Sequence, residues 1–186
     1  MKIQLNDPVI RKKLKSYLNS LPVKPRTIVD ELHVHRGNAI ADVVAVYKEP
    51  HCFEIKGETD SIYRLQSQGK FYDLVFKKIT LVTTQNHLKK ALESTPQHWG
   101  IIIAFLDKEK VKFRHVRKTK SNPSFCKKLA LLTLWKQEML NVSSLNKIEL
   151  PKKINKQELV LELANNLTIE KVNTEIANSL FKRATI

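Results

Sequence analysis

The sequence predicts an α/β fold, in which a core of strands and helices over residues 1–120 is followed by a helical extension over residues 121–186. Apolar, β-branched runs bounded by turn residues recur through the first segment, with helical patterns between them. After Asn122-Pro123, apolar residues recur only at helical spacing. We therefore expect a mixed central sheet flanked by helices, with a C-terminal part built of helices alone.

Helices are expected where apolar residues recur every three or four positions after a capping residue. The clearest is an amphipathic helix over residues 7–20, which Asn6 or Asp7 caps. Its other face is basic and carries Arg11, Lys12, Lys13 and Lys15. The remaining helices are expected at about 26–32, 61–76 (capped by Asp60 or Ser61), 86–94, 124–141, 155–166 and 168–182.

Strands are expected where apolar and β-branched residues run together without a polar helical face. Residues 39–47 and 51–56 form a hairpin around the turn residues 48–50. Val111 and Phe113 alternate with basic residues, which predicts an edge strand with a basic outer row. Further strands are expected at 33–35, 79–83 and 100–105.

The chain is strongly basic, with 33 Lys and Arg against 18 Asp and Glu and a formal net charge of +15. Such a balance predicts a polyanionic partner, either nucleic acid or an anionic membrane surface. The longest apolar run, Ile101–Leu106, is far shorter than the roughly 20 residues that span a bilayer. The N-terminus has no apolar h-region of a signal peptide. We therefore expect a cytoplasmic protein that binds nucleic acid and not a membrane.

The two cysteines, Cys52 and Cys126, are too few for a disulfide framework in a chain of this size. Cys52 falls in an apolar strand and is expected to be a small core residue. Trp135 lies among Leu131, Leu132 and Leu134, which favours a core position over a base-stacking platform.

The end of the second hairpin strand carries the candidate site. Asp42 lies across the hairpin from Glu54 and Lys56, and the equal parity of the three positions places them on one face of the sheet. Two carboxylates and an ammonium at the end of an apolar sheet are costly to desolvate. Considered alone, the pattern is more often a cross-strand salt bridge than an active site.

The chemistry of these groups matches phosphodiester hydrolysis. Mg²⁺ prefers oxygen ligands, one or two of them carboxylates, together with waters and substrate phosphate. Asp42 and Glu54 supply two carboxylates, and Lys56 beside them can hold a water or stabilise charge on a phosphate. A strongly basic chain with such a site is typical of a nuclease.

The order and spacing of the motifs are similar to those of a known superfamily. Glu31 precedes the hairpin, and Gln68-x-x-x-Tyr72 lies on the helix that follows it. Over roughly residues 8–140 the chain resembles the PD-(D/E)XK nuclease superfamily, which has a restriction-endonuclease-like fold, and within it a family of small bacterial and phage-associated proteins. The chain departs from the motif at Ala41, where the superfamily's name has Pro. It also has Ile40 where relatives often carry an arginine.

The resemblance implies a role for each matching residue. Asp42, Glu54 and the carbonyl of Ile55 would hold Mg²⁺ or Mn²⁺, and Glu31 would complete a second metal site or hold a water on the metal. Lys56 would orient the nucleophilic water or stabilise the transition state. The helix residues Gln68, Tyr72 and Arg64 would position Lys56 or contact the nucleic-acid backbone, although Arg64 could equally be a solvated side chain.

A basic segment between Asp107 and Lys136 is a candidate surface for tracking phosphates. Its central side chains are Lys112, Arg114, Arg117 and Lys118. The alternative is a solvated face that keeps the protein soluble.

Taken together, these features predict a Mg²⁺- or Mn²⁺-dependent nuclease with DNA as the expected substrate. Two alternatives remain. One is a nucleic-acid-binding module without turnover on a nuclease fold. The other is a partner protein in a phage or defence system, whose C-terminal helices bind a second copy or another chain.

Overall fold

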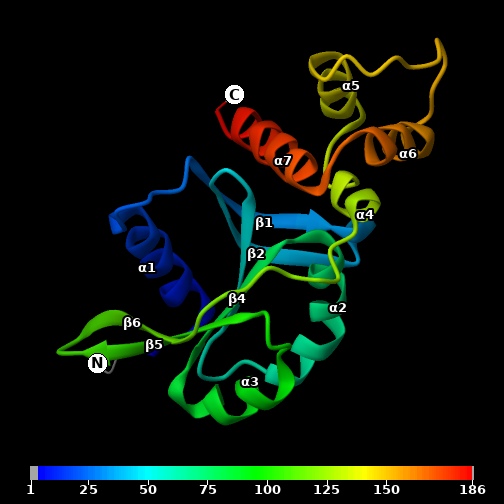
Figure 1. Ribbon diagram of the computed structural model, residues 1–186. Helices are drawn as coiled ribbons and strands as arrows, with labels where there is room; N and C mark the ends of the chain where they lie inside the picture. Colours follow the sequence, from blue (N-terminus) through cyan, green and yellow to red (C-terminus); the bar gives the residue numbers. More distant parts are fainter. Residues whose placement is uncertain (1–3, 186) are drawn as a thin grey trace.

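The computed structural model describes residues 4–185, and within this range the side chains of Arg64 and Gln66 are not described. A six-stranded mixed sheet forms the centre, with the strands in the order β1-β2-β3-β4-β5-β6. The β3–β4 and β4–β5 pairs are parallel and the other three pairs are antiparallel. Helices cover both faces of the sheet (Figure 1). No helix of the described part of the chain is long and apolar enough to cross a membrane.

The strands are β1 (Thr27–Val34), β2 (Ala39–Val46), β3 (Pro50–Lys56), β4 (Lys78–Thr84), β5 (Gly100–Asp107) and β6 (Lys110–Arg117). The α-helices are α1 (Asp7–Ser20), α2 (Leu65–Val75), α3 (Leu88–Ser94), α4 (Lys127–Leu131), α5 (Lys136–Leu145), α6 (Lys156–Asn166) and α7 (Ile169–Arg183). Short 3₁₀ turns occupy His35–Gly37, Ile62–Arg64 and Gln85–His87.

One face of the sheet is covered by α1. Its residues Ile10, Leu14 and Leu18 recur at helical spacing and are buried in one cluster with Phe53 and Ile55 of β3. The helix begins as expected, because the Asn6 side chain accepts a hydrogen bond from the Val9 N–H at 3.1 Å. The basic residues of α1 are left on its other faces.

The opposite face of the sheet carries α2 and the C-terminal helices. Tyr72 of α2, Leu163 of α6 and Leu180 of α7 belong to the same buried cluster as Val44 and Cys52 of the sheet. The helical extension therefore shares its apolar core with the sheet (Figure 1). The expected core position of Cys52 is confirmed.

The expected hairpin, the strands near 79–83 and 100–105 and the basic edge strand are confirmed as β2–β3, β4, β5 and β6. The helix expected at about 26–32 is wrong, because this segment is the edge strand β1. Pairing with β2 on both sides of Glu31 decides the conformation of this segment. Polar residues on its exposed side gave it a helix-like pattern, which an edge strand can also show.

Two helix boundaries also differ from expectation. The helix expected over 124–141 is divided into α4 and α5, and the connection between them leaves Trp135 60% exposed rather than in the core. Ser61 makes no capping hydrogen bond, and the Asp60 carboxylate instead accepts from the Gly57 N–H at 2.7 Å. A 3₁₀ turn therefore begins the segment that α2 continues.

Because the extension shares the core, truncating Leu163 should destabilise the whole chain. Leu163→Ala removes a fully buried side chain and should lower the free energy of unfolding by about 2–5 kcal/mol. Urea denaturation followed by circular dichroism and by tryptophan fluorescence should give one coincident transition.

The matched control is Leu161→Ala on the same helix, where the side chain is 42% exposed and the change should stay within about 0.5 kcal/mol. Two separate transitions, with only one of them moved by Leu163→Ala, would show instead that residues 121–186 unfold independently.

Candidate metal and nucleic-acid site

The candidate site lies where β2 and β3 separate. The pairing of these strands ends at Val43 and Phe53, and Asp42 and Glu54 come next along each strand. Asp42 Oδ2 accepts a hydrogen bond from the Ile55 N–H at 2.8 Å, so a carboxylate replaces the backbone acceptor that a continued ladder would supply. The side chain of Asp42 is therefore held in the opening between the two strands.

The neighbouring strand is irregular at the same level. Glu31 of β1 has φ 53°, a left-handed conformation that is uncommon for a residue with a side chain. No Cα pairing is found between Glu31 and Asp42, although Asp30 pairs with Val43 and Leu32 with Ala41. Such strain persists where the surrounding structure imposes it, and it is concentrated at functional sites.

Regular alternation of side chains along the strands does not by itself bring Asp42 to the same face as Glu54. Ala41 packs in the cluster on the α2 side of the sheet, whereas Val43 packs in the cluster under α1. The alternation of side chains is therefore interrupted at Asp42. Asp42 comes near Glu54 because β2 and β3 part at this point, and regular pleating alone does not account for it.

Glu54 is a buried carboxylate with one paired and one unpaired oxygen. Its side chain is 1% exposed, and Oε1 accepts from Lys56 Nζ at 2.5 Å. No donor of the described residues is directed at Oε2, because the Tyr72 hydroxyl beside this carboxylate donates to the Ile40 carbonyl instead. A buried carboxylate oxygen without a partner is costly and requires a cation, a water or a ligand.

The pKa of Asp42 also indicates that a cation would stabilise this site. Burial, followed by the nearby Glu54 carboxylate, raises the pKa of Asp42 to about 7, while the Ile55 N–H and Lys56 oppose this shift. A buried carboxyl group crowded by a second carboxylate is the arrangement that a bound cation relieves.

Helix α2 brings two of the predicted residues to the site. Tyr72 is fully buried, its hydroxyl donates to the Ile40 carbonyl at 2.7 Å, and its pKa is raised by burial and then by Glu54. A buried ring cannot reach a nucleic acid in this conformation, so Tyr72 can only position its neighbours. Gln68 Oε1 is buried and has no hydrogen-bond partner within residues 4–185. The Arg64 side chain lies outside the described part of the structure.

Arg11 belongs to this site as well, although its sequence pattern placed it only on the basic face of a helix. Its guanidinium donates to Asp42 Oδ1 and to Glu31 Oε1, each at 3.2 Å, and to Asp7 at 2.9 and 3.1 Å. Glu31 is 69% exposed and was expected to serve a second metal site, but here it pairs with Arg11. The spacing of Asp7 and Arg11 at i, i+4 was the only local clue, and helix surfaces often show such a pair.

The residues present fit one divalent cation. Glu54 Oε2, an oxygen of Asp42 and the Ile55 carbonyl would be the protein ligands. That carbonyl faces the same opening, because the N–H and C=O of one strand residue point to the same side. Mg²⁺ needs no more than one or two carboxylates besides waters and phosphate. The chain from residue 4 to 185 offers no group of three or more His, Cys, Asp or Glu that could hold a metal.

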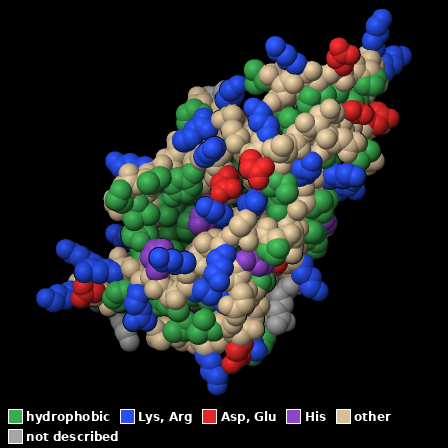
Figure 2. Space-filling model, in the orientation of Figure 1, with side chains coloured by type: hydrophobic (Ala, Val, Ile, Leu, Met, Phe, Trp, Pro, Cys, Tyr) green, Lys and Arg blue, Asp and Glu red, His purple; other side chains and the backbone are tan. Residues whose placement is uncertain are grey.

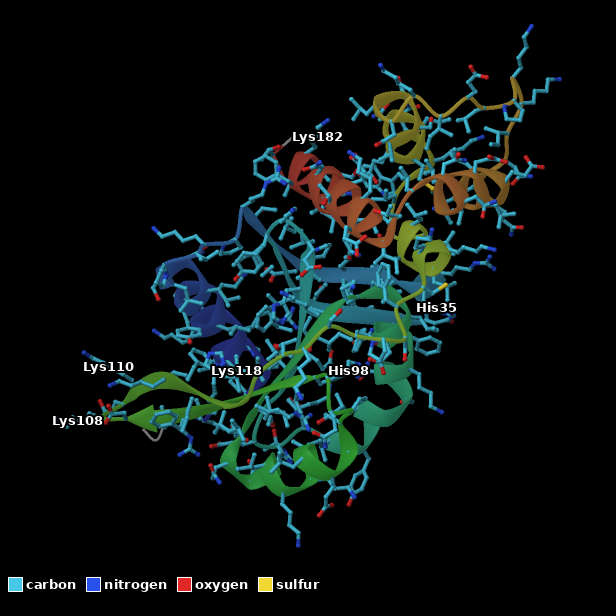
Figure 3. All side chains as sticks on the ribbon, viewed as in Figure 1. His35, His98, Lys108, Lys110, Lys118 and Lys182 are labelled. Atoms are coloured by element: carbon cyan, nitrogen blue, oxygen red, sulfur yellow. The ribbon has the colours of Figure 1, made fainter. Side chains whose placement is uncertain are left out.

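The predicted basic surface includes the β5–β6 hairpin, which projects from the body of the molecule (Figure 1). Lys108 and Lys110 lie at its end, while Lys118 lies near the centre of the view (Figure 3). The predicted residues Lys112 and Arg114 are exposed, with Lys112 paired to Asp107 at 2.7 Å and Arg114 donating to Gln85 at 2.9 Å.

Arg117 differs from the other predicted contacts. Its guanidinium donates to the Trp99 carbonyl at 2.7 Å, to the Pro96 carbonyl at 3.0 Å and to the Thr95 hydroxyl. These three protein acceptors occupy the side chain that was expected to contact phosphate. Arg117 therefore holds the end of β6 against the segment before β5. Of the four predicted phosphate contacts, Lys112, Arg114 and Lys118 remain exposed.

Comparison with known proteins adds a family relationship. The family model described as bacteriophage P4 protein cII matches residues 2–185. Protein cII of Enterobacteria phage P4 is 24% identical over 157 residues, which cover 84% of this chain and 59% of that protein. The chain thus spans about three fifths of the length of that relative. No solved structure matches. The expected association with phage proteins is confirmed.

The pKa of Asp42 predicts how stability depends on pH. The folded state holds a proton on Asp42 up to about pH 7, whereas the unfolded state releases it near pH 3.8. The contribution of Asp42 to the free energy of unfolding is therefore full below pH 3.8 and is lost as the pH rises to about 7. In chelator-treated protein, Asp42→Asn should remove this part of the decrease in unfolding free energy with rising pH. Urea denaturation of wild type and variant at several pH values between 4 and 8 measures it.

The control is Asp30→Asn, which changes a partly exposed carboxylate on the neighbouring edge strand β1, where it is paired with Lys15. Parallel stability curves for wild type and Asp42→Asn would show that Asp42 ionises normally and is not crowded by Glu54.

Proposed function

This chain belongs to the family described as bacteriophage P4 protein cII, and we propose that it is a divalent-metal-dependent nuclease that cleaves DNA. The observation that carries the proposal is the pair of crowded carboxylates at the end of β3. Glu54 Oε2 lacks a partner in the described structure, and Asp42 has its pKa raised to about 7 beside it. A Mg²⁺ or Mn²⁺ ion would satisfy both groups. When bound, it would supply a Lewis acid that activates water and neutralises phosphate charge.

Lys56 would supply a positive charge of the protein beside the bound metal ion. Its side chain is 12% exposed, and Glu54 Oε1 fixes its ammonium at 2.5 Å. A cation held in this way can orient a water or stabilise charge on a phosphate without reorganising during the reaction. The unpartnered Gln68 Oε1 adds a second polar atom that could orient a water on the α2 side.

The proposal includes the finer fold assignment. A mixed sheet flanked by helices is what a restriction-endonuclease-like core of the PD-(D/E)XK type requires, and the antiparallel β1–β2–β3 strands followed by α2 and parallel β4 are compatible with it. The exposed cations of the β5–β6 hairpin would hold the backbone of the nucleic acid.

One observation favours a second candidate function, a nucleic-acid-binding module without turnover. Arg11 already pairs with both Asp42 and Glu31, each at 3.2 Å. A guanidinium bound to a carboxylate occupies oxygens that a metal would otherwise use. On this alternative the carboxylates would hold α1 against the sheet, and only the basic surface would function.

Lys56→Met separates the two candidates. Methionine keeps the apolar stem and removes the ammonium, so the chain should fold and bind nucleic acid while cleavage falls by about 100- to 1000-fold, as when one donor to a transition-state charge is removed. Cleavage of plasmid and single-stranded DNA is measured with Mg²⁺, Mn²⁺ or EDTA.

Lys153→Met is the matched control, because this lysine is exposed in the connection before α6 and its loss should leave cleavage unchanged. Equal cleavage by wild type and Lys56→Met would reduce Lys56 to a salt-bridge partner. A wild type that binds but cleaves no substrate with any divalent ion would establish the binding module.

Binding should also weaken steeply with salt, because each neutralised phosphate releases counterions and contributes a slope of about −0.9 on duplex DNA. Replacing Lys112, Arg114 and Lys118 by Gln should make the slope shallower by about 0.9 for each lost phosphate contact. Fluorescence anisotropy of labelled duplex DNA at increasing KCl measures the slope, and Arg117 is kept because it supports the fold.

A triple control at Lys152, Lys153 and Lys156 removes the same number of exposed positive charges near α6. If this control flattens the slope as much as the hairpin variant does, binding depends on net charge alone and the hairpin is not a specific nucleic-acid-binding surface.

A further inference from the structure

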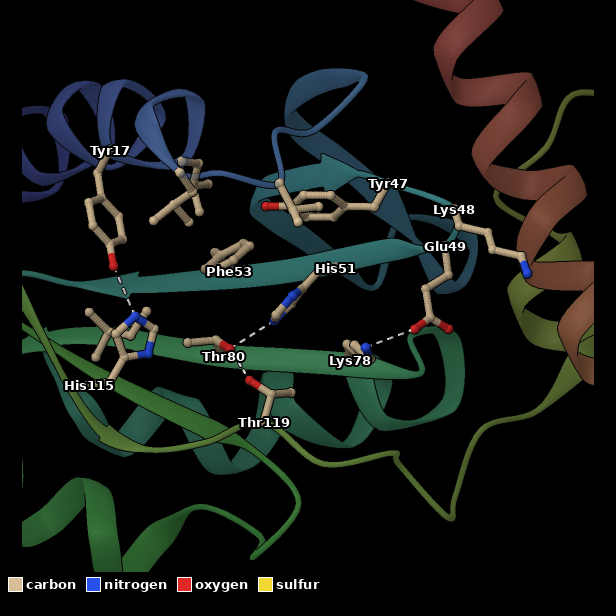
Figure 4. A pocket seen from close by; sticks show the side chains of 14 residues that line it. Tyr17, Tyr47, Lys48, Glu49, His51, Phe53, Lys78, Thr80, His115 and Thr119 are labelled. Carbon is tan, nitrogen blue, oxygen red and sulfur yellow. Dashed lines mark hydrogen bonds and ion pairs between the residues drawn. The ribbon is translucent and has the colours of Figure 1, made fainter.

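Apart from the carboxylate site, a cavity of about 440 Å³ opens on the α1 side of the sheet (Figure 4). Its walls come from the last turns of α1, from the starts of β3 and β4, and from the chain after β6. The lining is mainly apolar and aromatic, with Tyr17, Leu18, Tyr47 and Phe53 among its residues. This volume lies within the roughly 300–1,000 Å³ range of small-molecule sites.

A chain of hydrogen bonds runs through the cavity wall. His51 Nε2 is 2.8 Å from Thr80 Oγ1, which is 2.6 Å from Thr119 Oγ1 (Figure 4). The second ring nitrogen, His51 Nδ1, makes no hydrogen bond with the described residues. The ring is stacked on Phe53, with centroids 4.3 Å apart and an interplanar angle of 24°, which fixes its orientation.

This arrangement can form a hydrogen bond with the edge of an uncharged heteroaromatic ring. Burial, followed by Lys78 and His115, lowers the pKa of His51 to about 3, so the imidazole is neutral at neutral pH. If Thr80 donates to Nε2, the proton lies on Nδ1; if Nε2 donates to Thr80, Nδ1 is an acceptor. Either form is available because the threonine hydroxyls can reverse together. The cavity can thus donate to or accept from a neutral ring atom.

The surroundings of the cavity indicate what the ring would be attached to. Lys48 and Lys78 line the cavity with a single acidic residue, Glu49, which is paired with Lys78 at 3.1 Å. The mouth is therefore net positive, and hydrophobic side chains on this face of the molecule are bordered by Lys and Arg (Figure 2). A purely apolar ligand would leave the His51 edge unsatisfied, and a cation would meet like charge.

We propose that this cavity binds a heteroaromatic nucleobase, with the base against His51, Phe53 and the tyrosines and any attached phosphate at the lysine-bearing mouth. Aromatic walls stack on the face of a base, while the imidazole bonds to its edge. A nucleoside, a free nucleotide and a nucleotide within a strand all present such a base, and the chemistry of recognition is the same for all three.

This site is separate from the carboxylate site and does not depend on the proposed nuclease function. His51 lies at the start of β3 and Phe53 in its middle, packed on the α1 side of the sheet, whereas Glu54 and Lys56 lie toward its end. Helix α1 extends between them, with Arg11 at the carboxylates and Tyr17 at the cavity, where its hydroxyl lies 3.0 Å from His115 Nε2. The two sites can therefore be tested one at a time.

The test uses isothermal titration of the full chain with AMP, GMP, CMP and UMP in EDTA, so that no divalent ion takes part. At least one of them should bind saturably to the wild type. Val23→Trp places a large ring at the cavity, where Val23 is 73% exposed, and should weaken binding by about tenfold or more. Leu145→Trp, at a 67% exposed position on α5, is the matched control and should bind as the wild type does.

His51→Phe keeps the ring and its stacking but removes both nitrogens, so binding should weaken by about 2- to 10-fold, the effect of one neutral hydrogen bond. The corresponding nucleoside should bind about two- to fivefold more weakly than the nucleotide if the phosphate meets exposed lysines. A short oligonucleotide that displaces the nucleotide identifies a base within a strand as the ligand, and one that does not displace it identifies a free nucleotide.

The proposal is overturned if no nucleotide binds saturably up to millimolar concentration. It is equally overturned if Val23→Trp and His51→Phe both bind like the wild type, because the nucleotide would then be held elsewhere, for instance by the basic hairpin. Loss of nuclease activity in Lys56→Met has no bearing on this test, since the titration needs neither metal nor turnover.

Discussion

Asp42 accepts the Ile55 N–H at the point where β2 and β3 part, and the geometry of the carboxylate site depends on this hydrogen bond. An antiparallel ladder would normally use this N–H for a backbone carbonyl. By taking its place, the Asp42 carboxylate satisfies a buried donor and is held facing Glu54 across the opening. The strained Glu31 on the neighbouring strand lies at the same level and leaves room for Arg11. The Asp42 carboxylate therefore ends the pairing of β2 with β3 and positions itself beside Glu54 in the carboxylate site.

The ion pairs around this opening leave an excess of carboxylates over cations. Arg11 pairs with three carboxylates, Asp7, Glu31 and Asp42, and Lys56 pairs with one oxygen of Glu54, so two cations face four carboxylates. What remains among the described residues is one buried oxygen, Glu54 Oε2, with no partner. Because a lone buried carboxylate oxygen is costly, it is the atom that distinguishes a cation site from a set of structural salt bridges.

Helix α1 has more consequences for the molecule than its amphipathic pattern suggests. Its apolar side closes one face of the core, its first turns bring Arg11 to the carboxylates, and its last turns wall the nucleobase cavity. A helix that is buried against the middle of the sheet holds its two ends rigidly over opposite ends of β3. This rigidity lets one short element serve two separate regions of the surface.

The sequence by itself determined the β2–β3 hairpin, the helix over residues 7–20 and the position of Glu54 and Lys56 at a strand end, because these follow from local periodicity and capping. Tertiary structure decided the rest. Edge strand β1 exists because β2 offers it backbone partners, and Trp135 is exposed because the chain turns between α4 and α5. Arg11 reaches Asp42, 31 residues away, only when α1 packs on the sheet. Such contacts depend on the whole fold, so no local pattern encodes them.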